Sequence, residues 1–155
     1  MRAVTATDNR KDETDPTYVG SIRGGFGNPL KTIKTARPIA DEVRDAFQQA
    51  LMARGLFGPS GPNTLSVQVT AFSANQIVGP FARAAFDIQV RDAKGQAIYQ
   101  DVGDAGGYAF TFFSNGILAS SESLRAFMEE KMTAAIDQAL NKPDFLAAVK
   151  ASRSP

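Results

Sequence analysis

Histidine and cysteine are both absent from the 155 residues of this chain. Without them the chain cannot build a Ser-His-Asp or Cys-His nucleophile system, and it lacks the nitrogen and sulfur ligands that zinc sites usually use. It also has no imidazole to exchange protons near neutral pH. The remaining chemistry rests on carboxylates, lysines, tyrosines and the backbone. We therefore expect a binding or scaffolding module rather than an enzyme, with no catalytic residue, no metal ligand and no cofactor.

A strong excess of either charge is also absent, because 17 basic residues face 16 acidic ones and the formal net charge is +1. This balance offers little attraction for a polyanion, so a nucleic-acid partner is not expected. Residues 55–82 carry no charge, but polar residues, glycine and proline interrupt them throughout, which excludes a transmembrane helix. The lack of cysteine suits an oxidising compartment and is also found in cytosolic proteins, so it does not fix the location.

Two segments have the periodicity of an amphipathic helix. Apolar side chains recur every three or four residues over positions 39–51, directly after a proline that suits a first helical turn. Gly55 is placed for a left-handed cap at the end of this helix. The second helix is expected to start at a serine cap, Ser120 or Ser121, and to end at Asn141.

Strands are predicted from alternating apolar and polar residues. Residues 65–71 and 84–90 alternate in this way, and a turn at 92–95 leads into a third strand over 96–102. The glycine-rich residues that follow, like the stretch 75–80, are expected to break the strands. Shorter strand-like segments occur at residues 3–7, 17–22 and 31–35.

These elements predict an α+β fold, a two-layer sandwich in which two amphipathic helices cover one face of an antiparallel-rich mixed sheet. We expect a single domain over residues 3–150 and a disordered tail over residues 151–155. The core is predicted to join apolar helix residues to apolar strand residues: Val43, Phe47, Leu51, Phe127, Ile136 and Leu140 against Leu65, Val67, Val69, Phe86, Ile88 and Val90.

A glycine-rich, basic segment before the first helix is the first candidate binding site. Its Gly-Gly-Phe-Gly run is followed by Asn-Pro and not by a helix with Lys-Ser/Thr, so it does not fit a phosphate-binding loop. We interpret residues 20–35 as a mobile loop that attracts an anionic headgroup, a glycan carboxylate or an acidic partner, with a merely solvated surface as the alternative. The expected partner-binding residues are Arg23, Phe26, Lys31 and Lys34.

An aromatic segment before the second helix is the second candidate. Tyr108, Phe110, Phe112 and Phe113 lie close together in a stretch without charge. One interpretation is a fourth core strand. The other is a partly exposed aromatic patch that binds a partner, and we assign these four residues to partner binding on that basis.

Carboxylates provide the alternative to a binding module. Two groups contain neighbouring acids, Asp12, Glu13 and Asp15 in one and Asp101 with Asp104 in the other, but neither matches a calcium-binding loop. Both lie in turn-rich sequence, where aspartate commonly bonds to its own backbone. A small carboxylate-based enzyme, or a ligand-binding protein that uses the glycine-rich loop around Arg23, therefore stays open as the second function.

Several short motifs together resemble a known family. They are the first strand with its Asp-Asn-Arg end (residues 4–10), Tyr-Val-Gly at 18–20, Arg-Gly-Gly-Phe-Gly at 23–27, the helix 43–55, the strand 65–69 and Asp-Phe at 144–145. In this arrangement the chain resembles the YajG-type group of small bacterial envelope lipoproteins.

The resemblance implies a domain that is held by a lipidated cysteine to a bacterial membrane, expected to be the outer membrane, and that faces the periplasm without catalysis. The signal peptide and the lipidated cysteine are missing here, so we expect them upstream of Met1 in the full-length protein. The expected partners are an envelope protein, peptidoglycan or lipid, and a second copy of the chain is a further expected partner.

Overall fold

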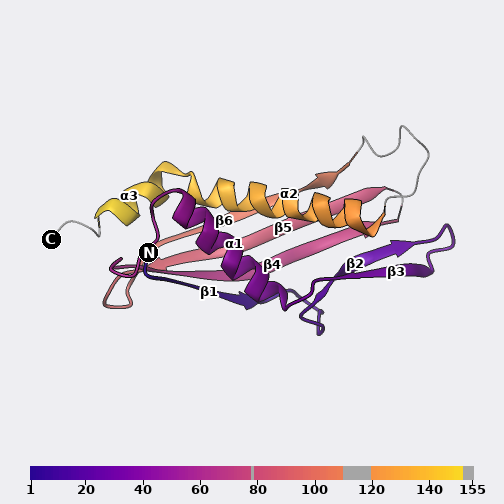
Figure 1. Ribbon diagram of the computed structural model, residues 1–155, viewed down its shortest axis with the longest axis horizontal. Coiled ribbons are helices and arrows are strands. Elements are labelled where there is room, and N and C mark those ends of the chain that lie inside the picture. The colour runs from indigo at the N-terminus through magenta and orange to yellow at the C-terminus, as the bar shows by residue number, and fades with distance from the viewer. Residues whose placement is uncertain (78, 110–119, 152–155) are drawn as a thin grey trace.

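The computed structural model describes residues 1–77, 79–109 and 120–151, and these form a six-stranded mixed sheet with helices on one face (Figure 1). This confirms the predicted α+β sandwich. The elements in chain order are β1 (Ala3–Asp8), β2 (Tyr18–Arg23), β3 (Pro29–Lys34), α1 (Ile39–Ala53), β4 (Thr64–Gln76), β5 (Pro80–Arg91), β6 (Ala97–Tyr108), α2 (Ser121–Leu140) and α3 (Pro143–Ala151). None of the helices within these ranges is both long enough and apolar enough to cross a membrane.

The sheet is organised around β4. The order is β3-β2-β4-β5-β6, and β4, β5 and β6 form an antiparallel meander. On its other edge β4 has two partners in succession: β1 pairs with it in parallel from Thr64 to Val69, and β2 pairs with it in parallel at Gln76. One edge of a single long strand therefore holds two separate strands end to end.

The strand β4 is longer than its sequence pattern predicts. It was expected to end at Ala71 and to be broken over residues 75–80, but it continues to Gln76. The reason is a bulge, because the pairing with β5 shifts between Val69 and Ala71. The extra residue moves every following side chain to the opposite face of the sheet. The buried positions of β4 therefore change from odd to even residue numbers, and Phe72 is buried on the face that the helices cover.

The strand β6 also exceeds its prediction, which ended it at Val102. It continues through the glycine-rich residues to Tyr108. Gly103 lies beneath α2, and a Cβ atom on it would stand 2.3 Å from the carbonyl oxygen of Ala135. The glycine is therefore required for the close approach of a helix to a strand and does not mark a loop.

The two main helices lie over the same face of the sheet (Figure 1). The turn after α1 confirms the predicted cap: Gly55 has a φ of 65°, and the N–H of Leu56 donates to the carbonyl of Leu51 at 2.8 Å. At the start of α2, the Ser120 hydroxyl accepts from the N–H of Ser123 at 3.1 Å. All the core residues predicted from the helix and strand patterns are buried, as expected: Val43, Phe47, Leu51, Phe127, Ile136 and Leu140 on the helices, and Leu65, Val67, Val69, Phe86, Ile88 and Val90 on the strands.

The helices α1 and α2 are not parallel. They meet at their C-terminal ends, where Arg54 forms an ion pair with Asp137 at 2.6 Å and donates to the side chain of Asn141. Toward the other end of α2 the two helices diverge (Figure 1). The helix α3 continues beyond α2 and buries Phe145 against the ring of Tyr99. It includes Ala151, which we had placed in a disordered tail, while residues 152–155 lie outside the described residues.

The two edges of the sheet differ in how they are covered. Along β6, Gln138 accepts from the N–H of Asp104 at 2.7 Å and Lys142 donates to the carbonyl of Val102 at 3.2 Å. The Lys142 ammonium also pairs with Asp101, and together with the hydroxyl of Tyr99 it lowers the pKa of that carboxyl to about 2. At the opposite edge, every residue of β3 except Ile33 is exposed.

Replacement of Phe47 by alanine tests the packing of the two layers. Phe47 is fully buried and its ring meets that of Phe86 edge-on at 5.3 Å. We expect Phe47→Ala to lower the free energy of unfolding by roughly 3–5 kcal/mol, measured by urea denaturation, because a large side chain leaves a cavity. Met52→Ala on the exposed side of the same helix is the control and should change it by less than about 0.5 kcal/mol. Equal effects would show that α1 is not docked through Phe47.

Candidate functional site

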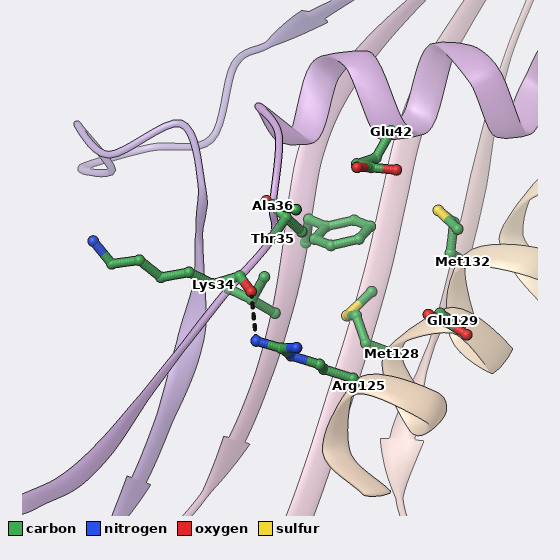
Figure 2. A pocket seen from close by; sticks show the side chains of 10 residues that line it. Lys34, Thr35, Ala36, Glu42, Arg125, Met128, Glu129 and Met132 are labelled. Carbon is green, nitrogen blue, oxygen red and sulfur yellow. Dashed lines mark hydrogen bonds between the residues drawn. The ribbon is translucent and has the colours of Figure 1, made fainter. Parts of the chain in front are cut away.

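A groove opens on the helix side of the molecule where α1 and α2 diverge. It encloses about 210 Å³. Its floor is apolar and comes from three elements: Val19 of β2, Phe72 of β4, and Met128 and Met132 of α2. Three of these are nearly buried, with 3–5% of their surface exposed, and Met132 is half-buried. Figure 2 shows the two methionines pointing from α2 toward the space in front of α1.

The rim of the groove carries both charges. Arg125 and Glu129 come from α2 and Glu42 from α1, while the segment after β3 forms another side (Figure 2). Arg125 donates through Nη2 to the backbone carbonyl of Lys34 at 3.0 Å. Glu42 is engaged by the guanidinium of Arg37, at 3.1 Å for each of two bonds. Over the described ranges neither Arg125 nor Glu129 forms an ion pair, so one cation and one carboxylate face the mouth of the groove.

The lining of this groove is suited to contact with an apolar group. Methionine is flexible and polarisable, so a methionine-lined floor adapts to apolar groups of different shape. The two rim charges can pair with polar groups on either side of such a group. Among residues 1–77, 79–109 and 120–151, no group of three or more acidic residues could hold a metal ion.

A second, larger hollow lies on the open face of the sheet, where β1 ends and β2 begins beside β4. It encloses about 620 Å³ and is lined by Tyr18, Arg23, Asn75 and Ile77 among others. Its central side chain is Arg10. The Arg10 guanidinium binds the carboxylate of Asp8 through two bonds of 2.8 Å and also donates to the backbone carbonyls of Tyr18, Asp15 and Phe72.

Arg10 is therefore a structural residue. Only 8% of its side chain is exposed, and its bonds join the end of β1, the start of β2 and the middle of β4. The backbone N–H of Asn9 adds a bond to the carbonyl of Val69 at 2.9 Å. These contacts satisfy polar groups along the stretch of β4 edge that neither β1 nor β2 covers.

The glycine-rich segment forms a β-hairpin whose pairing shifts register at two places, so our interpretation of residues 20–35 as a loop is wrong. The strand-like segments predicted at residues 17–22 and 31–35 are confirmed. Residues 18–34 contain β2 and β3, which pair with each other. Gly20 is buried, and a Cβ atom on it would stand 1.9 Å from the carbonyl oxygen of Ala74, so this glycine permits β2 to approach β4. The N–H of Ser21 adds a bond to the side chain of Asn75 at 3.0 Å.

The four predicted binding residues of this segment occupy different places. Phe26 stands at the turn of the hairpin and is fully exposed, at 102%. Arg23 ends β2 and Lys31 lies on β3, and both are exposed. Lys34, at the far end of β3, is paired with Asp15 at 2.6 Å. This ammonium, together with the N–H and hydroxyl of Thr17, holds the pKa of the Asp15 carboxyl far below its usual range.

The aromatic segment is described only at its start. Tyr108 is the last residue of β6 and is 57% exposed, with its ring 5.0 Å from that of Phe81 on the neighbouring strand. It therefore belongs to the surface and not to the core. Phe110, Phe112 and Phe113 lie outside the described residues, so the choice between a core strand and an exposed patch stays open for them.

Three of the carboxylates singled out in the sequence, Asp15, Asp101 and Asp104, have partners on nearby residues. Asp104 forms an ion pair with Arg83 at 2.6 Å, and this contact lowers the pKa of Asp104. Asp101 is held by Lys142 and Tyr99, and Asp15 by Lys34. Each acts as a tie between elements, and they are not brought together into a pair that could serve in acid–base chemistry.

The groove and the Arg10 cluster were not predicted from the sequence. Met128 and Met132 belong to the apolar stripe of α2 and gave the signal of ordinary core residues. These two methionines line an open groove because α1 and α2 diverge, and the angle between two helices cannot be read from sequence periodicity. Arg10 appeared only as the end of a polar run, and a lone arginine after a strand carries no signal that its side chain will be buried.

Comparison with known proteins places the fold but not the activity. No protein-family model and no curated protein sequence matches the chain. The crystal structure of XCC0632 from Xanthomonas campestris, of the family DUF330, is similar with a TM-score of 0.69 at 13% identity, over 99% of this chain and 88% of that one. A variant of PelC from Paraburkholderia phytofirmans, a dodecamer, has a TM-score of 0.50 at 15% identity, over 90% and 85% of the two chains. A minor lipoprotein from Acinetobacter baumannii reaches 0.36 at 12% identity over 85% and 93%, which is too low to carry an argument.

Replacement of Arg10 by lysine tests the cluster on the open face. Lysine keeps the charge but cannot span Asp8, Tyr18 and Phe72 with one planar group. We expect Arg10→Lys to lower the free energy of unfolding by roughly 1–3 kcal/mol, because buried carbonyl groups lose their hydrogen-bond donor. Arg91→Lys, at an exposed arginine whose side chain donates to the carbonyl of Gly95, should change it by less than about 0.5 kcal/mol. Similar denaturation midpoints for both variants would contradict the structural role.

Proposed function

We propose that this chain is the non-enzymatic domain of a bacterial envelope lipoprotein, and that it binds a segment of an envelope protein in the groove between α1 and α2. The groove is the observation that carries this proposal. It combines an apolar floor with the carboxylate of Glu129 and the guanidinium of Arg125 at its mouth, neither of which forms an ion pair within the described residues. The alternative enzyme around Arg23 gains no support, because the Arg23 side chain donates to the backbone carbonyl of Gly27 and, within the described residues, to no carboxylate.

The chemistry of the groove favours a protein segment over the other two expected partners. Peptidoglycan strands present many hydroxyl groups, which the floor of Val19, Phe72 and two methionines leaves without hydrogen bonds. An anionic lipid headgroup at the mouth meets Glu42 and Glu129 as like charges. A peptide supplies one apolar side chain for the floor and charges of both signs for the rim, which suits all the groups present.

The proposed location is the periplasmic face of the outer membrane, through a lipid anchor upstream of Met1. It is supported by the resemblance to the YajG-type lipoproteins in the motifs around Arg10, Gly20 and Phe26. The fold shared with XCC0632 and PelC is compatible with it, although likeness at 13–15% identity concerns the fold alone.

Photo-crosslinking tests the groove as the partner site. A photoreactive amino acid in place of Met132 is expected to give one discrete protein adduct in envelope preparations of the source bacterium, and mass spectrometry identifies it. The same amino acid at Met52, an exposed position on the outer side of α1, is the matched control and should not give that adduct. The added variant Glu129→Lys should weaken the Met132 adduct several-fold. Adducts of equal yield at both positions, or none at Met132, would overturn the proposal.

Self-association is the second part of the proposal. The PelC structure is a dodecamer, and in this chain β3 is an edge strand that is exposed along nearly its whole length. An exposed edge is a template for pairing with another chain. We expect light scattering to give a molecular mass above the 16.5 kDa of one chain. Thr32→Lys on β3 should lower this measured mass, because a lysine on an edge strand opposes pairing with another chain. Gln100→Lys on β6 should leave the mass unchanged, and a monomer at every concentration would contradict self-association.

A further inference from the structure

Large apolar side chains are exposed together at one end of the molecule. Phe26 is exposed at 102%, Leu30 at 58% and Ile77 at 64%. Phe26 and Leu30 belong to the end of the β2–β3 hairpin, and Ile77 follows directly on β4. Pairing between Ile22 and Gln76 places the hairpin beside the end of β4. We call this surface, with the flanking Arg23 and Lys31, the apolar tip.

The apolar tip projects from the sheet and is held in a defined shape. Figure 1 shows the hairpin of β2 and β3 extending past the other strands, away from both labelled ends of the chain. Its turn is closed by two backbone bonds, from Gly24 N–H to Asn28 at 2.9 Å and from Gly27 N–H to Gly24 at 2.8 Å. Gly27 has a φ of 79°, which a larger residue adopts only with strain. The side chain of Phe26 is therefore presented to the surroundings by a preorganised turn.

The segments of the chain that form the apolar tip carry charge of one sign. No aspartate or glutamate occurs from residue 16 to residue 40, or from residue 64 to residue 86. Lys34 and Arg37 in the first stretch are neutralised by acids outside it. Arg23 and Lys31 are different, because among the described residues neither has a carboxylate partner. Two free cations thus flank the exposed phenylalanine and leucine.

From these observations we infer that the apolar tip docks on the surface of an anionic phospholipid bilayer. Phe26 and Leu30 enter the boundary between headgroups and acyl chains, and Arg23 and Lys31 bind the lipid phosphates. Aromatic rings with neighbouring cations are favoured at this boundary, and each cation adds attraction to an anionic leaflet. The inference rests on the proposed envelope location but not on the groove, which lies on the helix face.

Tryptophan fluorescence provides a direct test, because the chain contains no tryptophan. In Phe26→Trp the single fluorophore sits at the turn of the hairpin. We expect its emission to shift to shorter wavelength when vesicles of equal parts phosphatidylethanolamine and phosphatidylglycerol are added, and to stay unchanged with phosphatidylcholine vesicles. Adding Arg23→Gln and Lys31→Gln to this variant should weaken the apparent affinity on the order of tenfold. High salt should weaken it as well.

Matched controls distinguish docking of the apolar tip from non-specific adsorption to vesicles. Met52→Trp places the fluorophore at another exposed apolar position, on the outside of α1, and its emission should not shift. Arg91→Gln with Lys94→Gln, added to Phe26→Trp, removes two exposed cations at the turn between β5 and β6 and should leave the affinity unchanged. Circular dichroism melting of all variants confirms that they are folded.

Three outcomes would overturn the inference. The first is an unshifted Phe26→Trp emission with anionic vesicles, and the second is an equal shift in Met52→Trp. The third is a shift that appears only with lipid-free envelope proteins, which would assign the apolar tip to a protein partner. None of these depends on the groove, since crosslinking from Met132 reports on that site separately. Failure of the lipid contact and failure of the proposed protein site are therefore distinguishable.

Discussion

The sheet depends on how one edge of β4 is shared. β1 covers the first part of this edge and β2 meets its last residue, so the backbone between Val69 and Gln76 has no continuous strand partner on that side. A buried backbone group without a hydrogen bond is costly. Arg10 resolves the problem by placing a guanidinium in the interruption, where it binds Asp8, Tyr18 and Phe72 at once. A planar group with five donors is suited to this task, and a shorter or non-planar cation is not.

The position of β2 then determines each surface that we consider functional. Val19 contributes to the floor of the groove on the helix face, and Tyr18 lines the hollow on the open face. Arg23, at the other end of the same strand, belongs to the apolar tip. β2 approaches β4 closely because Gly20 has no side chain to meet the carbonyl of Ala74. A shift of β2 along β4 would therefore change all three surfaces together.

Most of the fold could be predicted from the sequence, and the errors have physical causes. Periodicity revealed α1, α2 and the first part of the meander, because a buried face repeats every 3.6 or 2 residues. It failed after Val69, where a bulge reversed the phase of alternation, and after Val102, where glycine was read as a breaker although Gly103 makes room for α2. Around Gly20 the sequence predicted both a strand-like segment over residues 17–22 and a loop over residues 20–35, and the structure has the strand. Arg23, Phe26 and Lys31 were singled out because they lie in a glycine-rich, basic segment, and their role in binding stays a prediction. The groove arises from a helix crossing angle that no local pattern contains.

The groove and the apolar tip are joined by β3. Its tip end carries Leu30 and Lys31, and at its other end the carbonyl of Lys34 accepts from Arg125 at the rim of the groove. The side chain of Lys34 is fixed to Asp15 at the same point. Because β3 is an edge strand, these contacts and its pairing with β2 hold it in place. One short strand pair therefore connects the rim to the hairpin turn. The proposed protein segment in the groove and the proposed bilayer at the tip use different residues, so the two contacts do not compete.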